Sequence, residues 1–152
     1  MIESKNNQQI RTLLKLKKQS KERRKQKVFL VEGIRMFREV PKERVVKAYA
    51  TKSFFEEHEN LFSGVSYELV EDKIFKEISD TVTPQGVLAV VRQKEYSLTE
   101  ILAQSPNPCF LILENIQDPG NLGTMIRTGE GAGITGVIMS RDTVDIYNPK
   151  VI

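Results

Sequence analysis

Residues 115–133 read NIQDPGNLGTMIRTGEGAG, and this stretch decides the fold of the C-terminal part of the chain. An apolar run, CFLILEN at 109–115, leads into it, and a second apolar run, GVIMS at 136–140, follows it. Two buried strands joined by a turn and a helix form a βαβ unit, in which the strands are parallel. We therefore expect a fully buried strand beginning at Cys109, a turn over 118–121, a helix over 122–133 and a parallel strand over 136–140.

The expected turn carries residues suited to an anion. Ligands of open parallel sheets bind beyond the carboxyl ends of the strands. Gly120 and Gly123 permit close backbone approach, and the free N–H groups at a helix start favour a phosphate, so we expect a phosphate-facing loop here. Arg127 lies six positions after Asn121, close to two helical turns, and we expect both residues to border one crevice. The planar guanidinium matches a phosphate and stays charged at any working pH.

Packing alone offers a second explanation for this stretch. Glycines such as those of GEGAG (129–133) also let a helix approach a sheet closely. No Gly-Lys-Ser/Thr follows the turn, and Gly-x-Gly-x-x-Gly is absent from it, which excludes a Walker loop and the dinucleotide fingerprint. Spacing alone leaves the anion site and the packing explanation equally open.

Short apolar strands alternate with short helices through residues 27–91. The expected strands are 27–33, 44–51, 66–70 and 86–91, with helical segments at 34–40, 52–62 and 71–79 between them. A longer helix over 6–26 precedes them. This alternation predicts an α/β layer architecture. Glu32 and Gly33 are interpreted as a tight turn with Glu32 capping nearby amides, in preference to a catalytic role.

Residues 93–107 separate two domains. They are polar and end near two prolines, which is typical of a linker. We expect a small α/β/α domain over 1–92 and the start of a parallel-sheet α/β domain over 108–152. Two strands and one helix cannot cover both faces of a sheet, so the second domain is expected to be cut short.

The composition excludes several classes of protein. Hydrophobic residues make up 39% and charged residues 28%, as in a soluble globular protein. No apolar run approaches the roughly 18 residues of a membrane span, and the N-terminus lacks the apolar core of a signal peptide. Cys109 is the only cysteine, so an internal disulfide is excluded. Together with His58, the only histidine, it supplies too few soft ligands for zinc, so we expect no metal site. The expected location is cytoplasmic.

Positive charge is concentrated at the N-terminal end. Residues 1–31 hold ten basic and two acidic residues, a net charge of +8, whereas the remainder is near −5. Such a segment attracts polyanions. The expected RNA-binding residues are Lys18, Lys21, Arg23, Arg24, Lys25 and Lys27. The alternative is a helix face that is merely solvated.

The motif ENIQDPGNLGTMIRTGEGAGITGVIMS, followed by VDIYNPKVI, resembles the first motif region of the SpoU (TrmH) family of RNA ribose 2′-O-methyltransferases. FLVEGIRMFREV and TVTPQGVLAVV resemble the RNA substrate-binding domain that precedes the catalytic domain in that family. The resemblance touches nearly the whole chain. It implies a knotted SPOUT-type catalytic domain, S-adenosylmethionine as cofactor, RNA as partner, and a homodimer for the full-length enzyme.

The resemblance also implies residue roles. Arg127 matches the motif arginine that meets the target ribose and its phosphate and helps to activate the 2′-hydroxyl. Asn121 matches the asparagine that helps to order the site, and Asn148 to Lys150 match the stretch leading toward the second motif. The later motifs, which form the knot and cradle S-adenosylmethionine, have no counterpart here, so we expect no cofactor-binding residues in this chain and no activity from it alone.

Two further readings of the sequence stay open. The chain could be a non-catalytic RNA-binding module, or an interaction protein whose basic arm docks an acidic partner. Residues 83–86, TPQG, could face RNA, although a turn before a strand explains them equally well.

Overall fold

The computed structural model describes all residues, 1–152, and divides them into two compact units, residues 1–93 and 94–152. Residues 93–107 are expected as a linker. All of them but Gln93 lie in the second unit, where residues 98–102 form a short helix, α6 (Leu98–Leu102). No helix is long and apolar enough to cross a membrane.

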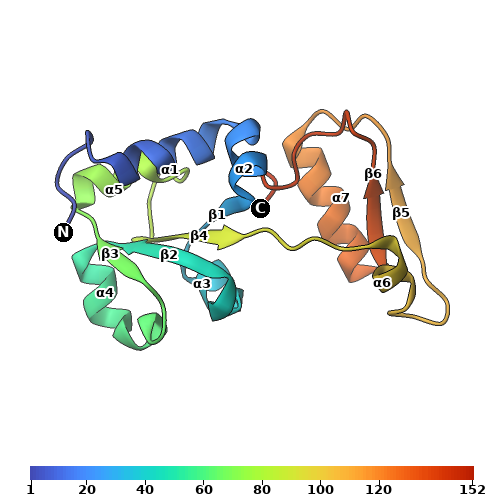
Figure 1. Cartoon of the computed structure of the whole chain (residues 1–152), viewed down its shortest axis with the longest axis horizontal. Helices are drawn as coiled ribbons and strands as arrows, with labels where there is room; N and C mark the ends of the chain where they lie inside the picture. The colour runs from blue at the N-terminus through green and yellow to red at the C-terminus, as the bar shows by residue number, and fades with distance from the viewer. The chain divides into compact units, whose positions relative to one another are not determined.

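The first unit is a mixed sheet covered on both faces by helices (Figure 1). Its strands lie in the order β1-β4-β2-β3, with β4 antiparallel to β1 and β2, and β3 parallel to β2. The strands are β1 (Val28–Glu32), β2 (Val45–Ala50), β3 (Tyr67–Leu69) and β4 (Val87–Arg92). Five α-helices and two 3-10 turns connect them: α1 (Gln8–Lys18), α2 (Ser20–Gln26), α3 (Ile34–Glu39), η1 (Lys42–Arg44), α4 (Lys52–His58), η2 (Glu59–Phe62) and α5 (Asp72–Ile78).

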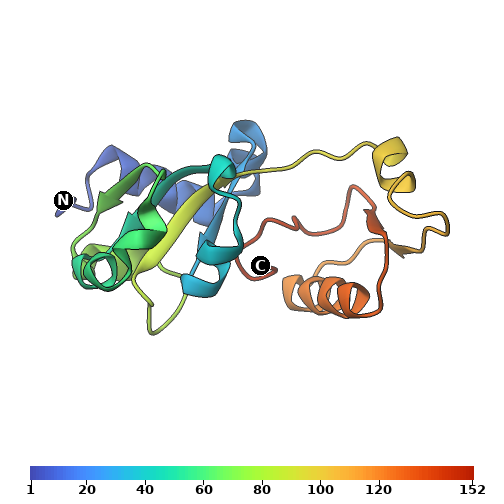
Figure 2. The ribbon, with the colours of Figure 1, turned by 90° about the horizontal axis from the view of Figure 1, so that it is seen from below.

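Alternating side chains of the central strand β4 feed two separate cores. Leu88 and Val90 pack with the apolar stripe of α1 and with α5. Val87, Ala89 and Val91 pack with α3, α4 and η2 on the opposite face. Figure 2 shows α3 and α4 in front of the sheet and α1 behind it. The expected α/β/α layers are confirmed, because each sheet face has its own helical cover.

The basic N-terminal segment forms two helices where the sequence predicts one. α1 ends at Lys18, and Gln19 is extended before α2 begins. The guanidinium of Arg23 donates to the carbonyl oxygens of Leu16 at 2.6 Å and Lys17 at 3.2 Å, which α1 leaves without helical partners. Arg23 is only 2% exposed, so the prediction that it binds RNA is wrong: its side chain caps a helix.

At the carboxyl end of β1, Glu32 holds the loop that follows α5. Its carboxylate accepts hydrogen bonds from the hydroxyls of Ser79 and Thr81 and from the backbone N–H of Asp80. Gly33 next to it has a φ of +92°, as expected for a tight turn. Glu32 thus has a structural part, but only one of its three donors is a backbone amide, that of Asp80, which lies 48 positions along the chain and is not local.

The second unit contains one βαβ element. β5 (Phe110–Leu113) and β6 (Gly136–Met139) are parallel and in register, and α7 (Pro119–Gly131) connects them. Leu111, Leu113 and Val137 face α7 and pack with Leu122. The expected strand–helix–strand order is therefore confirmed, although α7 begins earlier than predicted.

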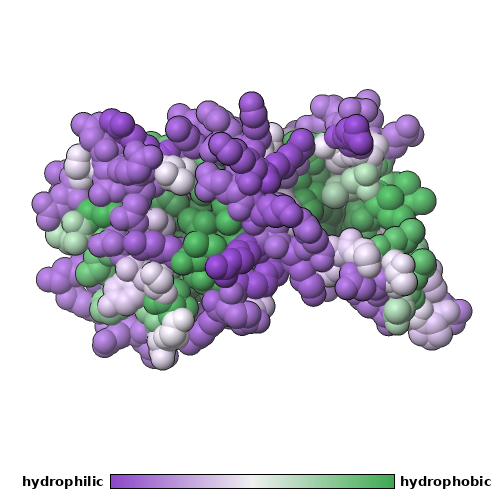
Figure 3. Space-filling view, viewed as in Figure 1, coloured by the Kyte–Doolittle hydropathy of each residue, from purple (hydrophilic) through white to green (hydrophobic).

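The other face of this two-stranded sheet is exposed. Ile112 and its register partner Ile138 are 72% and 43% exposed, and Figure 3 shows hydrophobic residues at this part of the surface. Cys109 is also exposed. The prediction of a fully buried strand from Cys109 is wrong, because α7 covers only one face of two strands.

We predict that Arg23→Ala lowers the free energy of unfolding by about 2 kcal/mol, the usual worth of hydrogen bonds to a charged group. Arg24→Ala, one residue further in α2 but exposed, should change it by less than about 0.5 kcal/mol. Urea midpoints of the two variants provide the measurement. Equal midpoints would contradict the capping role of Arg23.

Gly86 and Gly64 form a second matched pair. Both have positive φ, but a Cβ at Gly86 would lie 2.6 Å from Thr51 Oγ1 and 2.9 Å from Phe54 Cβ, whereas Gly64 has open space. Gly64→Ala should cost about 1 kcal/mol through backbone strain alone. Gly86→Ala should cost a further ~1–3 kcal/mol through overpacking, measured by the same urea titration. Equal losses would show that Thr51 and Phe54 move aside freely.

Candidate functional site

The start of α7 is where the sequence predicts an anion-binding loop. Residues 118–121, expected as a turn, form instead the N-cap and first turn of the helix. The carboxylate of Asp118 accepts a hydrogen bond from the backbone N–H of Asn121 at 2.7 Å. A capping side chain and a bound anion compete for the same N–H groups. The chain's own carboxylate therefore takes a donor that we expected to be free for phosphate.

The loops that follow β5 and β6 hold each other at the carboxyl edge of the sheet. Asn115 has a φ of +53°, and its N–H donates to Ser140 Oγ at 2.9 Å. Gln117 Nε2 donates both to Asn115 Oδ1 and to the carbonyl oxygen of Asp142. This edge is where open α/β sheets bind ligands, and the hydrogen bonds give it a defined shape.

Arg127 is exposed on α7, and its side chain turns back toward the start of the helix. Nη2 donates to Thr124 Oγ1 at 3.4 Å and Nη1 to the carbonyl oxygen of Val151 at 3.5 Å, both at the long limit of hydrogen bonding. No carboxylate forms an ion pair with it. Its charge is therefore available to a phosphate or to a developing oxyanion.

Asn121 is exposed one turn before Arg127's hydrogen-bond partner Thr124. Positions six apart on a helix point about 120° away from each other. The structure records no contact between the side chains of Asn121 and Arg127, and the guanidinium lies instead beside Gly123 and Thr124. That Asn121 and Arg127 border one crevice stays a prediction.

The glycines of α7 differ in what lies beside them. Gly123 is buried, and a Cβ there would lie 2.8 Å from the carbonyl oxygen of Val151 and 2.9 Å from Arg127 Nη1. The space beside Gly123 is thus taken by the Val151 carbonyl and the Arg127 guanidinium, and that Gly123 faces a phosphate stays a prediction. Gly120 is exposed and remains a candidate. Gly129 packs against Ile134, as the packing explanation requires.

Five of the six basic residues predicted to bind RNA are exposed, and Arg23 is the exception. The exposed five are Lys18, Lys21, Arg24, Lys25 and Lys27. They lie at the end of α1, on α2 and just before β1, at the amino end of that strand. Sequence periodicity could not single out Arg23, because α1 and α2 were expected to be one helix.

A second polar surface lies at the opposite end of the same sheet, where β1, β2 and β3 end and β4 begins. Three hollows of 370, 220 and 540 Å³ follow one another there. Gln85 lines both the first and the second, and Asp72 and Lys76 line both the second and the third. We call these three neighbouring hollows, which share lining residues, the edge groove.

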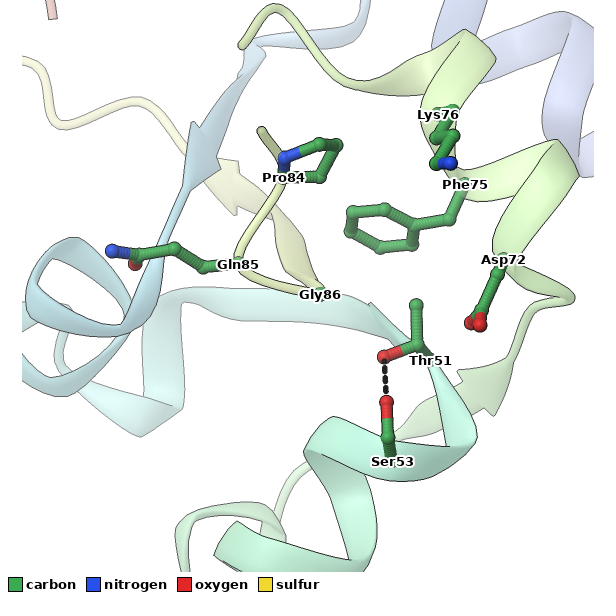
Figure 4. A pocket seen from close by; sticks show the side chains of 8 residues that line it. All are labelled: Thr51, Ser53, Asp72, Phe75, Lys76, Pro84, Gln85 and Gly86. Atoms are coloured by element: carbon green, nitrogen blue, oxygen red, sulfur yellow. Dashed lines mark hydrogen bonds between the residues drawn. The ribbon is translucent and has the colours of Figure 1, made fainter. Parts of the chain in front are cut away.

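Figure 4 shows the middle hollow of the edge groove from close by. The rings of Pro84 and Phe75 lie on one side, and the hydroxyls of Thr51 and Ser53 lie with the Asp72 carboxylate on the other. The sequence singled out the TPQG loop only as one of two alternatives. The sequence analysis missed Arg35, which lines the first hollow, and Lys76, which lines the other two. Nothing in the sequence indicates that α3 and α5, which carry them, lie at the same edge of the sheet.

Comparison with known proteins assigns both parts of the chain. Residues 7–89 match the MRM3-like substrate binding domain, and residues 108–152 match the SpoU rRNA Methylase family. The 23S rRNA (guanosine(2553)-2′-O)-methyltransferase RlmP of Bacillus subtilis is 35% identical over 99% of this chain and 58% of its own length. The mitochondrial rRNA methyltransferase 3 of Homo sapiens is 34% identical over 86% of this chain and 33% of its own length.

Solved structures share the fold. The AdoMet-bound rRNA methyltransferase of Sinorhizobium meliloti superposes with a TM-score of 0.84 at 23% identity, covering 99% of this chain and 57% of that one. The chain thus spans at most about three-fifths of the length of these relatives. Matches to both domains, in the same order along one chain, lead to one conclusion: the chain belongs to the SpoU rRNA methylase family, with an MRM3-like substrate-binding domain at its N-terminal end.

Proposed function

We propose that this protein serves the 2′-O-methylation of ribose in ribosomal RNA, with S-adenosylmethionine as methyl donor. One observation carries the proposal: Arg127 is exposed on α7, with its guanidinium turned toward Thr124 and the carbonyl oxygen of Val151, in the segment that matches the SpoU family, and no carboxylate neutralises it. The names of the relatives, which are rRNA methyltransferases, support the choice of ribosomal RNA.

Arg127 has a definite chemical task in this proposal. A ribose 2′-hydroxyl is a poor nucleophile until its proton is lost. A guanidinium held beside the hydroxyl oxygen stabilises the negative charge that develops there and so lowers the barrier. The same fork can grip the neighbouring phosphate and orient the sugar. Asn121, exposed at the start of the same helix, helps to order the site.

S-adenosylmethionine, when bound, would supply the methyl group, but the residues present here do not fit it. A cofactor site needs a concave wall that buries most of the ligand. One face of the β5–β6 sheet is covered by α7, and the other leaves Ile112 72% exposed. We therefore derive no step of the reaction through the cofactor from these residues.

RNA holding by the first unit alone is the second candidate function. It is favoured by the closed cores on both faces of the four-stranded sheet, which give this unit a complete fold. Its exposed basic residues on α2 supply charge for a polyanion.

The main proposal, RNA methylation, also includes a cytoplasmic location and a homodimer for the full-length enzyme.

The first test concerns the cofactor. In an isothermal titration of the 152-residue chain with S-adenosylmethionine, we expect no heat beyond dilution, because the sheet face that carries Ile112 and Ile138 is open to solvent. S-adenosylhomocysteine serves as a parallel titrant. Micromolar binding of either compound would contradict the absence of a cofactor site in this chain.

The second test concerns Arg127 in the full-length protein. Arg127→Ala should lower kcat for RNA methylation by roughly 10²–10³-fold, the usual loss when a donor to a developing oxyanion is removed. Lys94→Ala removes one positive charge from an exposed position in the same unit, in the segment before α6 and outside the loops after β5 and β6, and should leave kcat unchanged. Incorporation of labelled methyl groups into rRNA measures both. Equal activity of the Arg127 variant would refute the assigned role, and an inactive wild-type protein that still binds RNA would favour the second candidate.

A further inference from the structure

We propose that the edge groove of the first unit holds a single-stranded segment of the RNA, with Arg35 and Lys76 each contacting a phosphate and Gln85 lying between them. The inference rests on the proposed function and names a binding surface within it. This surface is separate from the basic residues of α2, which lie at the opposite end of the sheet.

The shape of the groove favours a polymer over a compact ligand. Three hollows lie in a row, and each shares lining residues with the next. A small molecule needs one concave site that encloses it. A row of neighbouring hollows along a sheet edge fits an extended chain with a repeating unit, and unpaired RNA is such a chain.

Charge in the groove favours a polyanion. Arg35 and Lys76 are exposed, and neither forms an ion pair with a carboxylate. The acidic side chains nearby are mostly committed elsewhere. Glu32 accepts three hydrogen bonds from residues 79–81, and Glu71 pairs with Lys73 at 2.9 Å.

The remaining polar groups suit a nucleotide better than a bare anion. Asp72 accepts hydrogen bonds, which a phosphate cannot donate but a ribose 2′-hydroxyl or a base amino group can. The hydroxyls of Thr51 and Ser53 both donate and accept, and Pro84 adds an apolar surface in the same hollow. This mixture of donor, acceptor and apolar surface matches a base and its sugar.

The groove is held in shape before any ligand arrives. Gln85 Oε1 accepts the N–H of Ile34 at 2.9 Å, which leaves the amide Nε2 as a donor. The backbone N–H of Gly33 donates to the carbonyl oxygen of Val87, and that of Thr51 to the carbonyl oxygen of Gly86. These bonds tie the TPQG loop to the ends of β1 and β2. A preformed surface loses less entropy when it binds.

The test uses the whole 152-residue chain and a labelled single-stranded RNA, with affinity followed by fluorescence anisotropy over a range of salt concentrations. The groove variant is Arg35→Gln with Lys76→Gln. Losing two phosphate contacts should weaken binding several-fold and reduce the slope of log K against log[salt] by about 1.4, since each contact to a single strand contributes about 0.7.

Two further variants separate the possible outcomes. Arg38→Gln with Arg11→Gln removes the same charge from exposed positions outside the groove and should leave the slope unchanged. Lys21→Gln with Arg24→Gln and Lys25→Gln tests the α2 surface. Because all substituted side chains are exposed, urea midpoints should match that of the wild-type chain.

The proposal is overturned if the α2 variant loses RNA affinity while the groove variant keeps the wild-type slope; RNA binding as a function would then stand. If the wild-type chain binds no RNA at all, the proposed function itself fails. The last measurement uses poly-glutamate as a competitor for the labelled RNA. Displacement of RNA by poly-glutamate at equal charge concentration would show a general anion surface and also overturn the proposal.

Discussion

The carboxyl-end edge of the first unit's sheet depends on the hydrogen bonds that the carboxylate of Glu32 accepts. This carboxylate stands at the end of β1 and accepts three hydrogen bonds from the loop after α5, so it joins two segments far apart in sequence. A carboxylate saturated by donors in this way organises a loop without disturbing the core beneath it. The turn at Gly33 and the close approach of Gly86 to Thr51 complete the same edge. The edge groove exists because these contacts hold three chain segments at fixed positions.

The second unit differs from the first because only one face of its sheet is covered. α7 buries one face of β5 and β6 through Leu122, while Ile112 and Ile138 stay exposed on the other. Within this unit, Asp118 satisfies a backbone donor at the start of α7, and Arg127 keeps its charge uncommitted. The unit therefore presents an uncommitted cation on α7 and leaves an apolar face that further contacts can cover.

Local pattern predicted most elements well. Short apolar runs bounded by turn residues located all four strands of the first unit, and the DPGN stretch located the βαβ element of the second. The errors share one physical cause. The break between α1 and α2, the burial of Arg23 and the exposure of Cys109 each depend on a contact, or a missing contact, with other parts of the chain. Periodicity carries no information about such contacts.

The sequence by itself determined the order of strands and helices and the family to which the motif belongs, and it singled out Arg127 as the candidate cation of the site. These follow from local spacing and from motif residues, which can be recognised without knowing what packs against them. Only the tertiary structure decided which cations are available and where they gather. Arg23 sits over carbonyl groups at the end of α1, whereas Arg35 and Lys76 line neighbouring hollows, because folding brings α3, α5 and the TPQG loop to one edge of the sheet.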